Sequence, residues 1–288
     1  MLLPRIVLGV TAGLILAGCG TSSAAPAGSF DPDRGPITVT LANRTLSLPS
    51  HLPTGATTFH FRTEDPQGHT VLLLRLPAGV TPADWLVDLH ATPPGTRYPT
   101  TENTGGALVV ADTTTTVTMV LTPGPYQLFD FFGQGVQDPT PAVRELTVAG
   151  NQRDTRIPAP DNVIVHADID GKPRFVVPDQ LPANGTFLVH NGSSAIEEAA
   201  FLPLRPEATE ADLAAFFEAI SKHEKPASIP FTGGAIGVPA LTPGRTAVVH
   251  FDAKPGRYVL ASFVTNPATG NRRAAEGVLR IVTLTQEG

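Results

Sequence analysis

Short stretches in which apolar residues alternate with polar ones, or follow one another without a break, recur along the whole chain. Residues 37–41 (ITVTL) alternate with a period of two, and residues 57–63 (TTFHFRT) place Phe59 and Phe61 on one face, as in strands that bury one side. Residues 71–74 (VLLL) are continuously apolar, which is typical of a strand covered on both faces. The pattern therefore predicts many short strands. Similar stretches in the second part of the chain are residues 162–166, 185–190, 247–251 and 258–264.

One short helix is predicted in each half of the chain. Residues 81–84 (TPAD) offer a threonine N-cap, a proline at the first helical position and an acidic residue in the first turn. Residues 209–212 (TEAD) repeat this capping pattern, and apolar side chains follow at helical spacing in residues 213–220. We expect these apolar side chains to dock the helix on the strands rather than to line a ligand site.

Motifs of the first half return in the second half in the same order. Three pairs of motifs lie 128 residues apart, and a fourth pair lies 132 residues apart. One match of this kind can arise by chance, but four in order predict a duplicated domain. We assign the four additional residues to a longer hairpin at residues 241–244. The paired segments are 74–76 with 202–204, 81–84 with 209–212, 105–107 with 233–235, and 123–126 with 255–258.

Composition and charge agree with exported β domains. The chain has 288 residues, a length that suits two domains, and its 27 glycines and 29 prolines suit strands joined by turns. The formal net charge is −6 and no dense run of Lys or Arg occurs, so the sequence does not favour a nucleic-acid partner. Because Cys19 is the only cysteine, disulfides within the chain are excluded.

The N-terminus has the features of an export signal. Residues 6–17 (IVLGVTAGLILA) are an uncharged apolar run that is too short to span a bilayer and has the right length for a signal peptide. Residues 16–19 (LAGC) resemble the lipobox of bacterial lipoproteins. That resemblance implies cleavage before Cys19, lipidation of its thiol, and attachment to the extracytoplasmic face of the cell membrane. An ordinary secretory signal or an N-terminal membrane anchor is the alternative.

These observations predict a division of the chain into five parts. Residues 150–160 (GNQRDTRIPAP) are polar and end in proline, which is typical of a linker between two domains. The predicted parts are a signal peptide at 1–18, a flexible tether at 19–35, a first domain at 36–149, the linker at 150–160, and a second domain at 161–286.

The order of motifs within each half is similar to that of cupredoxin-like domains in exported bacterial proteins. The order is an LPxG turn, a strand ending LLRL, a helix, a Gly-Gly pair, a PGxY turn and a closing VREL strand. The resemblance covers nearly all of residues 36–148 and 161–284. It implies a mainly β fold of two Greek-key β-sandwich domains, each with one short inserted helix. A Greek-key sandwich of another family is the alternative.

The resemblance also identifies the positions at which blue-copper members bind copper through two His, one Cys and usually one Met. No His, Cys or Met occurs in residues 127–148 or 259–288, where three of these ligands belong. We therefore expect neither half to form a blue-copper centre, and we predict no cofactor. The positions in ligand order are His69, Asp130, Gln137 and Ala142 in the first half, and Glu197, Ser262, Arg273 and Val278 in the second half.

Other catalytic and metal-binding motifs are absent from the sequence. No two histidines are closer than nine residues, so the paired His-X-His motifs of multicopper oxidases do not occur. Residues 168–171 (DIDG) begin like a Ca²⁺ loop, but the next residues lack the required acids, and a hairpin turn is the better interpretation. No serine lies in a G-x-S-x-G motif, and the Gly-Gly pairs lack the context of a phosphate loop. We predict that the protein is not an enzyme.

The sequence thus favours a lipid-anchored envelope protein whose metal-free domains act as a non-catalytic binding or scaffold module. Its expected partners are the membrane, through Cys19, and an unidentified envelope protein or small ligand. The alternative is a weak copper- or zinc-handling protein that uses His69 and nearby carboxylates such as Asp130. An enzyme with a site between the two domains is a third class, for which the sequence offers no supporting set of residues.

Overall fold

The computed structural model describes residues 35–42, 45–91, 97, 100–111, 113–134, 140–153 and 157–286. Cys19 and Gln137, which the sequence singles out, lie outside the described residues, as do the predicted signal peptide and nearly all of the tether. We call residues 35–153 the first half and residues 157–286 the second half. The division into domains at 36–149 and 161–286 stays a prediction.

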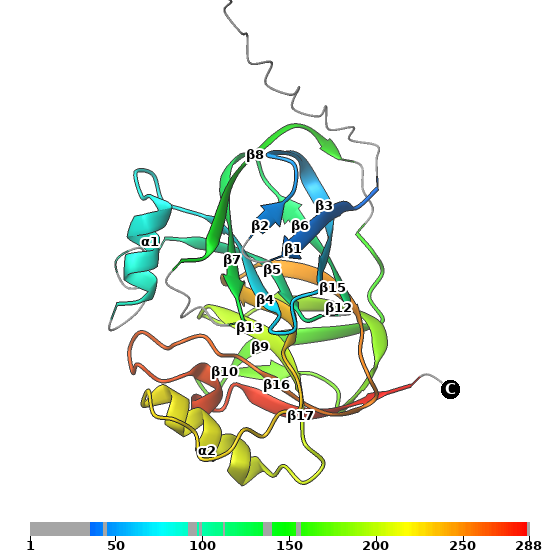
Figure 1. Ribbon diagram of the computed structural model, residues 1–288, viewed down its shortest axis with the longest axis vertical. Coiled ribbons are helices and arrows are strands. Elements are labelled where there is room, and N and C mark those ends of the chain that lie inside the picture. The colour runs from blue at the N-terminus through cyan, green and yellow to red at the C-terminus, as the bar shows by residue number, and fades with distance from the viewer. Residues whose placement is uncertain are drawn as a thin grey trace, which may run out of the picture.

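Strands dominate both halves (Figure 1). The first half contains β1 (Ile37–Ala42), β2 (Thr45–Ser47), β3 (His51–Thr63), β4 (His69–Arg75), β5 (Glu102–Val109), β6 (Thr114–Leu121), β7 (Gly124–Phe132) and β8 (Ala142–Arg153). The second half contains β9 (Asn162–Ile169), β10 (Lys172–Val176), β11 (Gln180–Pro182), β12 (Asn184–Asn191), β13 (Glu197–Pro203), β14 (Ile236–Leu241), β15 (Thr246–Asp252), β16 (Gly256–Ala261) and β17 (Leu279–Thr285).

Strand pairing builds the same two-layer Greek-key sandwich twice, so the predicted mainly β fold class is confirmed. In the first half, β1 runs parallel to β3 and β3 antiparallel to β6, while β8, β7, β4 and β5 form the second layer. In the second half, β9, β12 and β15 repeat the first layer, and β17, β16, β13 and β14 repeat the second. Because β3 also pairs with β8, all strands belong to one connected network.

Both layers continue from one half into the other. Strand β5 pairs antiparallel with β14, and β6 pairs antiparallel with β15, where Val117 lies opposite Val249. These two valines are equivalent, because Phe59 pairs with Val117 in the first half and Phe187 with Val249 in the second. The halves are therefore related by an approximate two-fold axis between β6 and β15. One hydrophobic core contains buried side chains from both halves.

The two predicted helices are present and begin at the predicted caps. In α1 (Pro82–Leu89) and α2 (Glu210–Ser221), the N-cap threonine hydroxyl accepts a hydrogen bond from the aspartate N–H at N3, and that carboxylate accepts one from the threonine N–H. Trp85 of α1 packs against Phe129 with 4.6 Å between ring centroids, and Phe217 of α2 packs against Phe263 at 5.1 Å. Among the helices in the described ranges, none has the length and apolar character needed to cross a membrane.

The pairing register corrects the predicted match between the Gly-Gly motifs and the predicted longer hairpin. Gly106 lies opposite Leu72, and Gly237 lies opposite the equivalent Ala200, so Gly106 corresponds to Gly237 rather than to Gly234. Both glycines have positive φ, and a Cβ would lie 1.9 Å from the carbonyl oxygen of Val71 or 2.2 Å from that of Ala199. Three of the four additional residues lie before Gly237, in the segment that contains α2, and the fourth is a bulge in β14.

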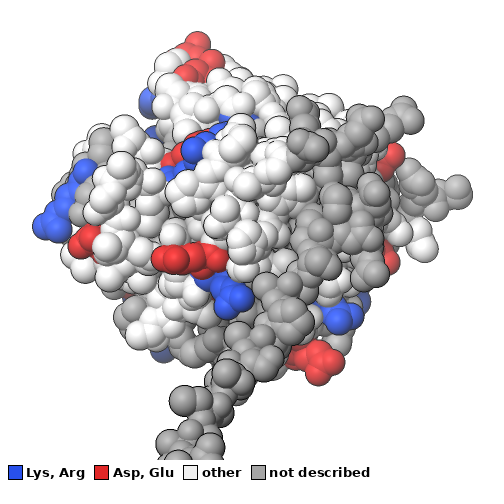
Figure 2. Space-filling view, turned by 90° about the horizontal axis from the view of Figure 1, so that it is seen from above, with Lys and Arg blue, Asp and Glu red and all other residues white. Residues whose placement is uncertain are grey.

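Charged side chains are scattered over the surface. Seen from above, the described Lys and Arg side chains lie singly or beside Asp and Glu, and neither sign gathers into one large patch on this face (Figure 2).

Candidate functional site

The first half places two of the predicted ligand positions in direct contact. His69 is the first residue of β4 and lies opposite β7, which carries Asp130. The Nδ1 atom of His69 lies 2.7 Å from Oδ1 of Asp130, and Nε2 lies 2.9 Å from Oδ2 of Asp65 in the turn before β4. The side chains of His69 and Asp130 are fully buried. We call these three residues the first pole.

The electrostatics of the first pole favour a charged imidazole. Burial of His69 disfavours the protonated ring, but hydrogen bonds and charge attraction from Asp130 and Asp65 outweigh burial and raise the pKa of His69 above its usual value. The Phe132 ring meets the imidazole edge-on at 5.5 Å between centroids, which keeps water away from one side. The pole is therefore an acid–base cluster in which both ring nitrogens are occupied.

The second half places Glu197 where the first half has His69. Its Oε1 atom lies 3.5 Å from Nε of Arg273, and both side chains are buried or nearly so. Burial raises the pKa of Glu197 to about 7, although Ser262 and Arg273 pull it down. Among the described residues, neither carboxylate oxygen of Glu197 has a hydrogen-bond partner. We call Glu197, Ser262 and Arg273 the second pole.

The remaining predicted positions lie at matching places beside the two poles. Ala142 pairs with Asp130 at the start of β8. In the second half, the N–H of Ser262 donates to the carbonyl oxygen of Val278 at 3.1 Å, and the Ser262 hydroxyl accepts the N–H of Glu198 at 3.3 Å. The structure thus brings each described position to the same end of its own half.

Three polar residues beside the poles were missed by the sequence reasoning. Glu198 accepts the N–H of Phe263, and removal of its carboxyl from water raises its pKa to about 7. Glu276 accepts hydrogen bonds from the Asn266 amide at 2.8 and 3.0 Å and fastens the connection between β16 and β17. Asp65 is the third missed residue, and its acidic type four residues before His69 was the only signal available.

Metal ligation by these clusters is limited by their existing contacts. In the part of the chain that the structure describes, no group of three or more His, Cys, Asp or Glu side chains is arranged to hold a metal ion. Copper prefers imidazole nitrogens with free lone pairs and a thiolate. At the first pole both His69 nitrogens face carboxylates, and at the second pole the guanidinium of Arg273 faces Glu197.

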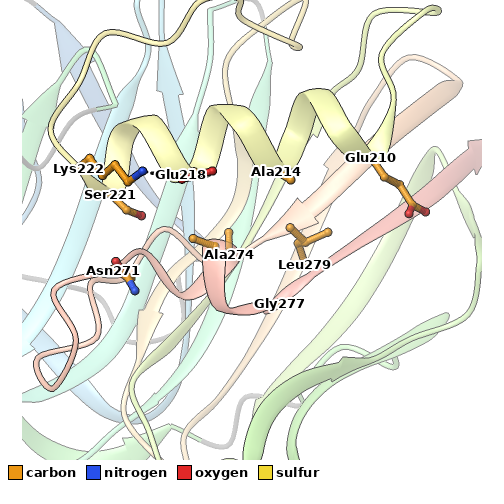
Figure 3. Close-up of a pocket in the computed structure, with 10 residues that line it drawn as sticks. Glu210, Ala214, Glu218, Ser221, Lys222, Asn271, Ala274, Gly277 and Leu279 are labelled. Carbon is orange, nitrogen blue, oxygen red and sulfur yellow. Dashed lines mark hydrogen bonds and ion pairs between the residues drawn. The ribbon is translucent and has the colours of Figure 1, made fainter.

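An open groove adjoins the second pole (Figure 3). It lies between α2 and the 3-10 helix η1 (Arg273–Glu276) and has a volume of about 580 Å³. Ala214 faces it from the middle of α2, and Ala274 and Leu279 face it from the other side. The lining residues are Glu210, Ala214, Glu218, Ser221, Lys222, Asn271, Ala274, Ala275, Gly277 and Leu279.

Comparison with known proteins gives structural neighbours only. No family model and no curated protein matches the chain. A reduced auracyanin from Roseiflexus castenholzii is 23% identical over 43% of this chain and 94% of its own, with a TM-score of 0.27. A multicopper oxidase is 14% identical over 87% of this chain and 88% of its own (TM-score 0.24), and the copper nitrite reductase of Thermus scotoductus is 11% identical over 88% and 62% (0.25). We draw nothing about function from likenesses at these TM-scores.

Proposed function

We propose that this chain is a lipid-anchored cell-envelope protein whose two cupredoxin-like halves act as a non-catalytic binding or scaffold module. The observation that carries the proposal is the first pole, where Asp130 and Asp65 occupy both ring nitrogens of His69. A buried imidazole held in this way serves the fold as an acid–base partner. It has no free nitrogen with which to ligate copper.

The second pole supports the same proposal through different chemistry. The guanidinium of Arg273 places a positive charge 3.5 Å from Glu197. A cation placed there would be repelled, and the serine hydroxyl at position 262 is a poor substitute for a thiolate. Both halves thus keep the strands around the predicted ligand positions. The residues at these positions form hydrogen bonds and ion pairs within the chain.

Titration of the purified protein with Cu²⁺ tests the absence of a copper centre. We expect no stoichiometric binding and no intense visible charge-transfer band, because Cys19 is the only cysteine and neither pole contains a cysteine at a predicted ligand position. A one-to-one complex with such a band would overturn the proposal. A titration with Zn²⁺, followed by calorimetry, extends the test to a metal without a visible spectrum.

Weak metal handling is a second candidate, favoured by one observation. The Oδ2 atom of Asp130 is buried and has no hydrogen-bond partner among the described residues, so one carboxylate oxygen beside His69 is unused. This candidate requires His69→Ala to lower the affinity for Zn²⁺ or Cu²⁺ measured by calorimetry. Unchanged weak binding in the variant would assign the metal to surface groups and remove the candidate.

The membrane anchor is tested independently of the domains. We expect a labelled fatty acid to be incorporated into the wild-type protein and not into Cys19→Ala, because Cys19 carries the only thiol in the chain. Equal labelling of both proteins would refute lipidation at this residue. Capture of envelope proteins by the unlipidated variant, with a surface-matched unrelated domain as control, then searches for the partner.

A further inference from the structure

The connection between β16 and β17, residues 262–278, is fastened to β13 through two neighbouring acidic side chains. The Oε1 atom of Glu197 lies 3.5 Å from Nε of Arg273, and the Glu198 carboxylate accepts the N–H of Phe263 at 2.5 Å. The attachment of this connection to β13 therefore includes two groups that can gain or lose a proton.

The contact between Glu197 and Arg273 is incomplete. The Glu197 side chain is fully buried, and among the described residues neither of its carboxylate oxygens has a hydrogen-bond partner. The facing Nε of Arg273 lacks one within the same described ranges, and its gap of 3.5 Å is longer than a usual N–H···O hydrogen bond. Arg273 is shared as well, since its Nη1 atom lies 3.5 Å from Oε2 of Glu276. A buried carboxylate without hydrogen bonds is costly to ionise, so this arrangement favours a protonated Glu197.

Two carboxyl groups at this attachment titrate near neutral pH. Burial raises the pKa of Glu197 and that of Glu198 to about 7. The His166 ring contacts the Glu198 backbone carbonyl at 3.1 Å, but burial lowers the pKa of His166 to about 4, so the ring stays neutral above about pH 5. Ionisation of the two glutamates is therefore the change of charge that acts directly on the attachment. The other polar and charged groups that act on these three side chains are Glu276, Asp168, Ser262, Arg273, Arg272, His190 and the N–H of Phe263.

The connection covers apolar side chains of the second half. Phe263 packs against Phe217 of α2 with 5.1 Å between ring centroids, and Phe217 is fully buried. Ala274 of η1 is 1% exposed and belongs to the same hydrophobic cluster. A movement of the connection away from β13 would therefore give water access to the two carboxyl groups and uncover this apolar cluster beside α2.

We propose that the connection is a pH-sensitive latch, which is closed on β13 while Glu197 and Glu198 carry protons and opens when they ionise. In the open state the two carboxyl groups are hydrated, and their pKa returns to the ordinary value of 4.5. Because the pKa of each group is raised in the closed state, the advantage of that state is complete below about pH 4.5 and is lost as the pH rises through about 7. The latch thus restricts access to Phe217 and Ala274 to neutral and alkaline pH.

Amide hydrogen exchange of the purified full-length protein, expressed as protection factors, tests the latch. The N–H of Glu198, which donates to the Ser262 hydroxyl at 3.3 Å, and the N–H of Phe263 report the attachment directly. We expect both factors to fall by at least about tenfold between pH 5 and 7.5, because each carboxyl group that opening hydrates contributes up to about tenfold per pH unit.

A reference amide separates local opening from global unfolding. The N–H of Thr147 in β8 donates to the Ser50 carbonyl at 2.8 Å and serves as this reference. At pH 7.5 the factors of Glu198 and Phe263 should lie at least about tenfold below that of Thr147, because the latch opens without the rest of the fold. Factors that do not change with pH, or that equal the factor of Thr147 throughout, would overturn the proposal.

Cleavage by trypsin at pH 8 tests the latch at one fixed pH. Trypsin cuts after Arg272 and Arg273 when the connection is open, and mass spectrometry identifies these cuts. The side chain introduced by Glu197→Gln cannot ionise, and the variant leaves Arg273 its contact with Glu276. We therefore expect cleavage at these two arginines to be at least about fivefold slower than in wild type.

A second variant and a matched control complete the test. Glu198→Gln keeps an oxygen acceptor for the Phe263 N–H and should also slow the cleavage. Glu224→Gln changes an exposed acid beyond the end of α2 and should be cleaved like wild type. Wild-type rates in both latch variants, or equal slowing in all three variants, would overturn the proposal. The Cu²⁺ titration and the fatty-acid labelling do not measure this movement, so failure of the latch is distinguishable from failure of the proposed function.

Discussion

The two poles occupy the same place in a repeated fold and are held together in different ways. At the first pole, His69 has a hydrogen-bonded carboxylate on each ring nitrogen, and its pKa is raised. At the second pole, the guanidinium of Arg273 lies 3.5 Å from Glu197, and burial raises the pKa of Glu197 to about 7. The comparison teaches that equivalent positions of a repeated fold can hold a well-satisfied ion cluster in one half and a poorly satisfied ion pair in the other.

The connections beside the two poles also differ in the part of the molecule to which they are bound. The first half sends Gln134 into the second half, where its side-chain amide exchanges hydrogen bonds with the backbone N–H and carbonyl of Ala235. The second half instead ties its connection to its own helix through Arg272 and Ser221. In the second half, the connection held in this way borders the groove between α2 and η1.

The largest effect is expected at Gly106 and Gly237, where each half has a glycine with a positive φ close to a backbone carbonyl. Gly106→Ala and Gly237→Ala each drive a methyl group into a backbone carbonyl at a positive φ, so each should lower the free energy of unfolding by roughly 3–5 kcal/mol or prevent folding. Chemical denaturation measures the loss. Gly171→Ala is the matched control, because its φ is also positive but its Cβ meets nothing within 4 Å, and about 1 kcal/mol is expected. Equal losses at Gly106 and Gly171 would contradict the close approach.

Neutralising the acid at each pole should have opposite consequences. Asp130→Asn removes the buried counter-charge of His69 and should lower the free energy of unfolding by about 3 kcal/mol at pH 6. Glu197→Gln removes a carboxyl that is costly to ionise and should raise it by about 1–2 kcal/mol at pH 8. Denaturant unfolding of both variants at both pH values decides the comparison. Destabilisation of similar size in the two variants would show that the poles are equally well satisfied.

The pH dependence of stability should separate the poles. His69 has a raised pKa, so its contribution is complete below about pH 6.5 and is lost as the pH rises through its folded-state value. Glu197 and Glu198 have pKa values raised to about 7, so their carboxyl groups favour folding at low pH and lose that contribution between about pH 4.5 and 7. Each group contributes a slope of at most about 1.4 kcal/mol per pH unit.

Substitutions at the titrating residues should show which half causes each part of the pH dependence of stability. His69→Gln should flatten the decline above about pH 6.5, and Glu197→Gln should reduce the decline between about pH 4.5 and 7 while leaving the part due to Glu198. His166 acts in the opposite direction, because burial lowers its pKa to about 4 and stability is lost as the pH falls from about 6.5 toward 4. An unchanged pH profile in His69→Gln would show that the first pole does not titrate in this range.

The sequence predicted the elements of this fold better than the contacts between its halves. Capping residues and period-two strands are local signals, so both helix starts and the repeated strands were predicted from a few neighbouring residues. The register near Gly106 was predicted wrongly, because the Gly-Gly motif at 233–234 matches in letters while the backbone needs its glycine at 237. Matching of sequence motifs does not show which backbone carbonyl a Cβ at a given position would contact.

The predicted site positions show a similar limit. The resemblance singled out positions such as His69 and Glu197, but the side chains that contact these two residues come from elsewhere in the chain. Asp65 lies in the turn before β4, and Arg273 lies in the connection after β16, so neither belongs to the strand that carries the residue it contacts. The groove was not predicted, because it lies between α2 and the connection after β16, whose contacting residues Ser221 and Arg272 are 51 residues apart in sequence.

The smallest effect is expected at the contact that joins the first pole's connection to the second half. Gln134→Ala removes the hydrogen bonds to Ala235 and the one to the Val109 carbonyl, so the free energy of unfolding should fall by about 1–2 kcal/mol.

Trp85 is the only tryptophan and lies in the first half, so its fluorescence reports that half, whereas circular dichroism reports all strands. Because both layers cross between the halves, the two signals should change at one denaturant midpoint in wild type and move together in Gln134→Ala. Gln180→Ala, at an exposed position, is the control. Separate midpoints in wild type would mean that the halves unfold independently despite their shared sheets, and the comparison of the poles would then concern two separately stable domains.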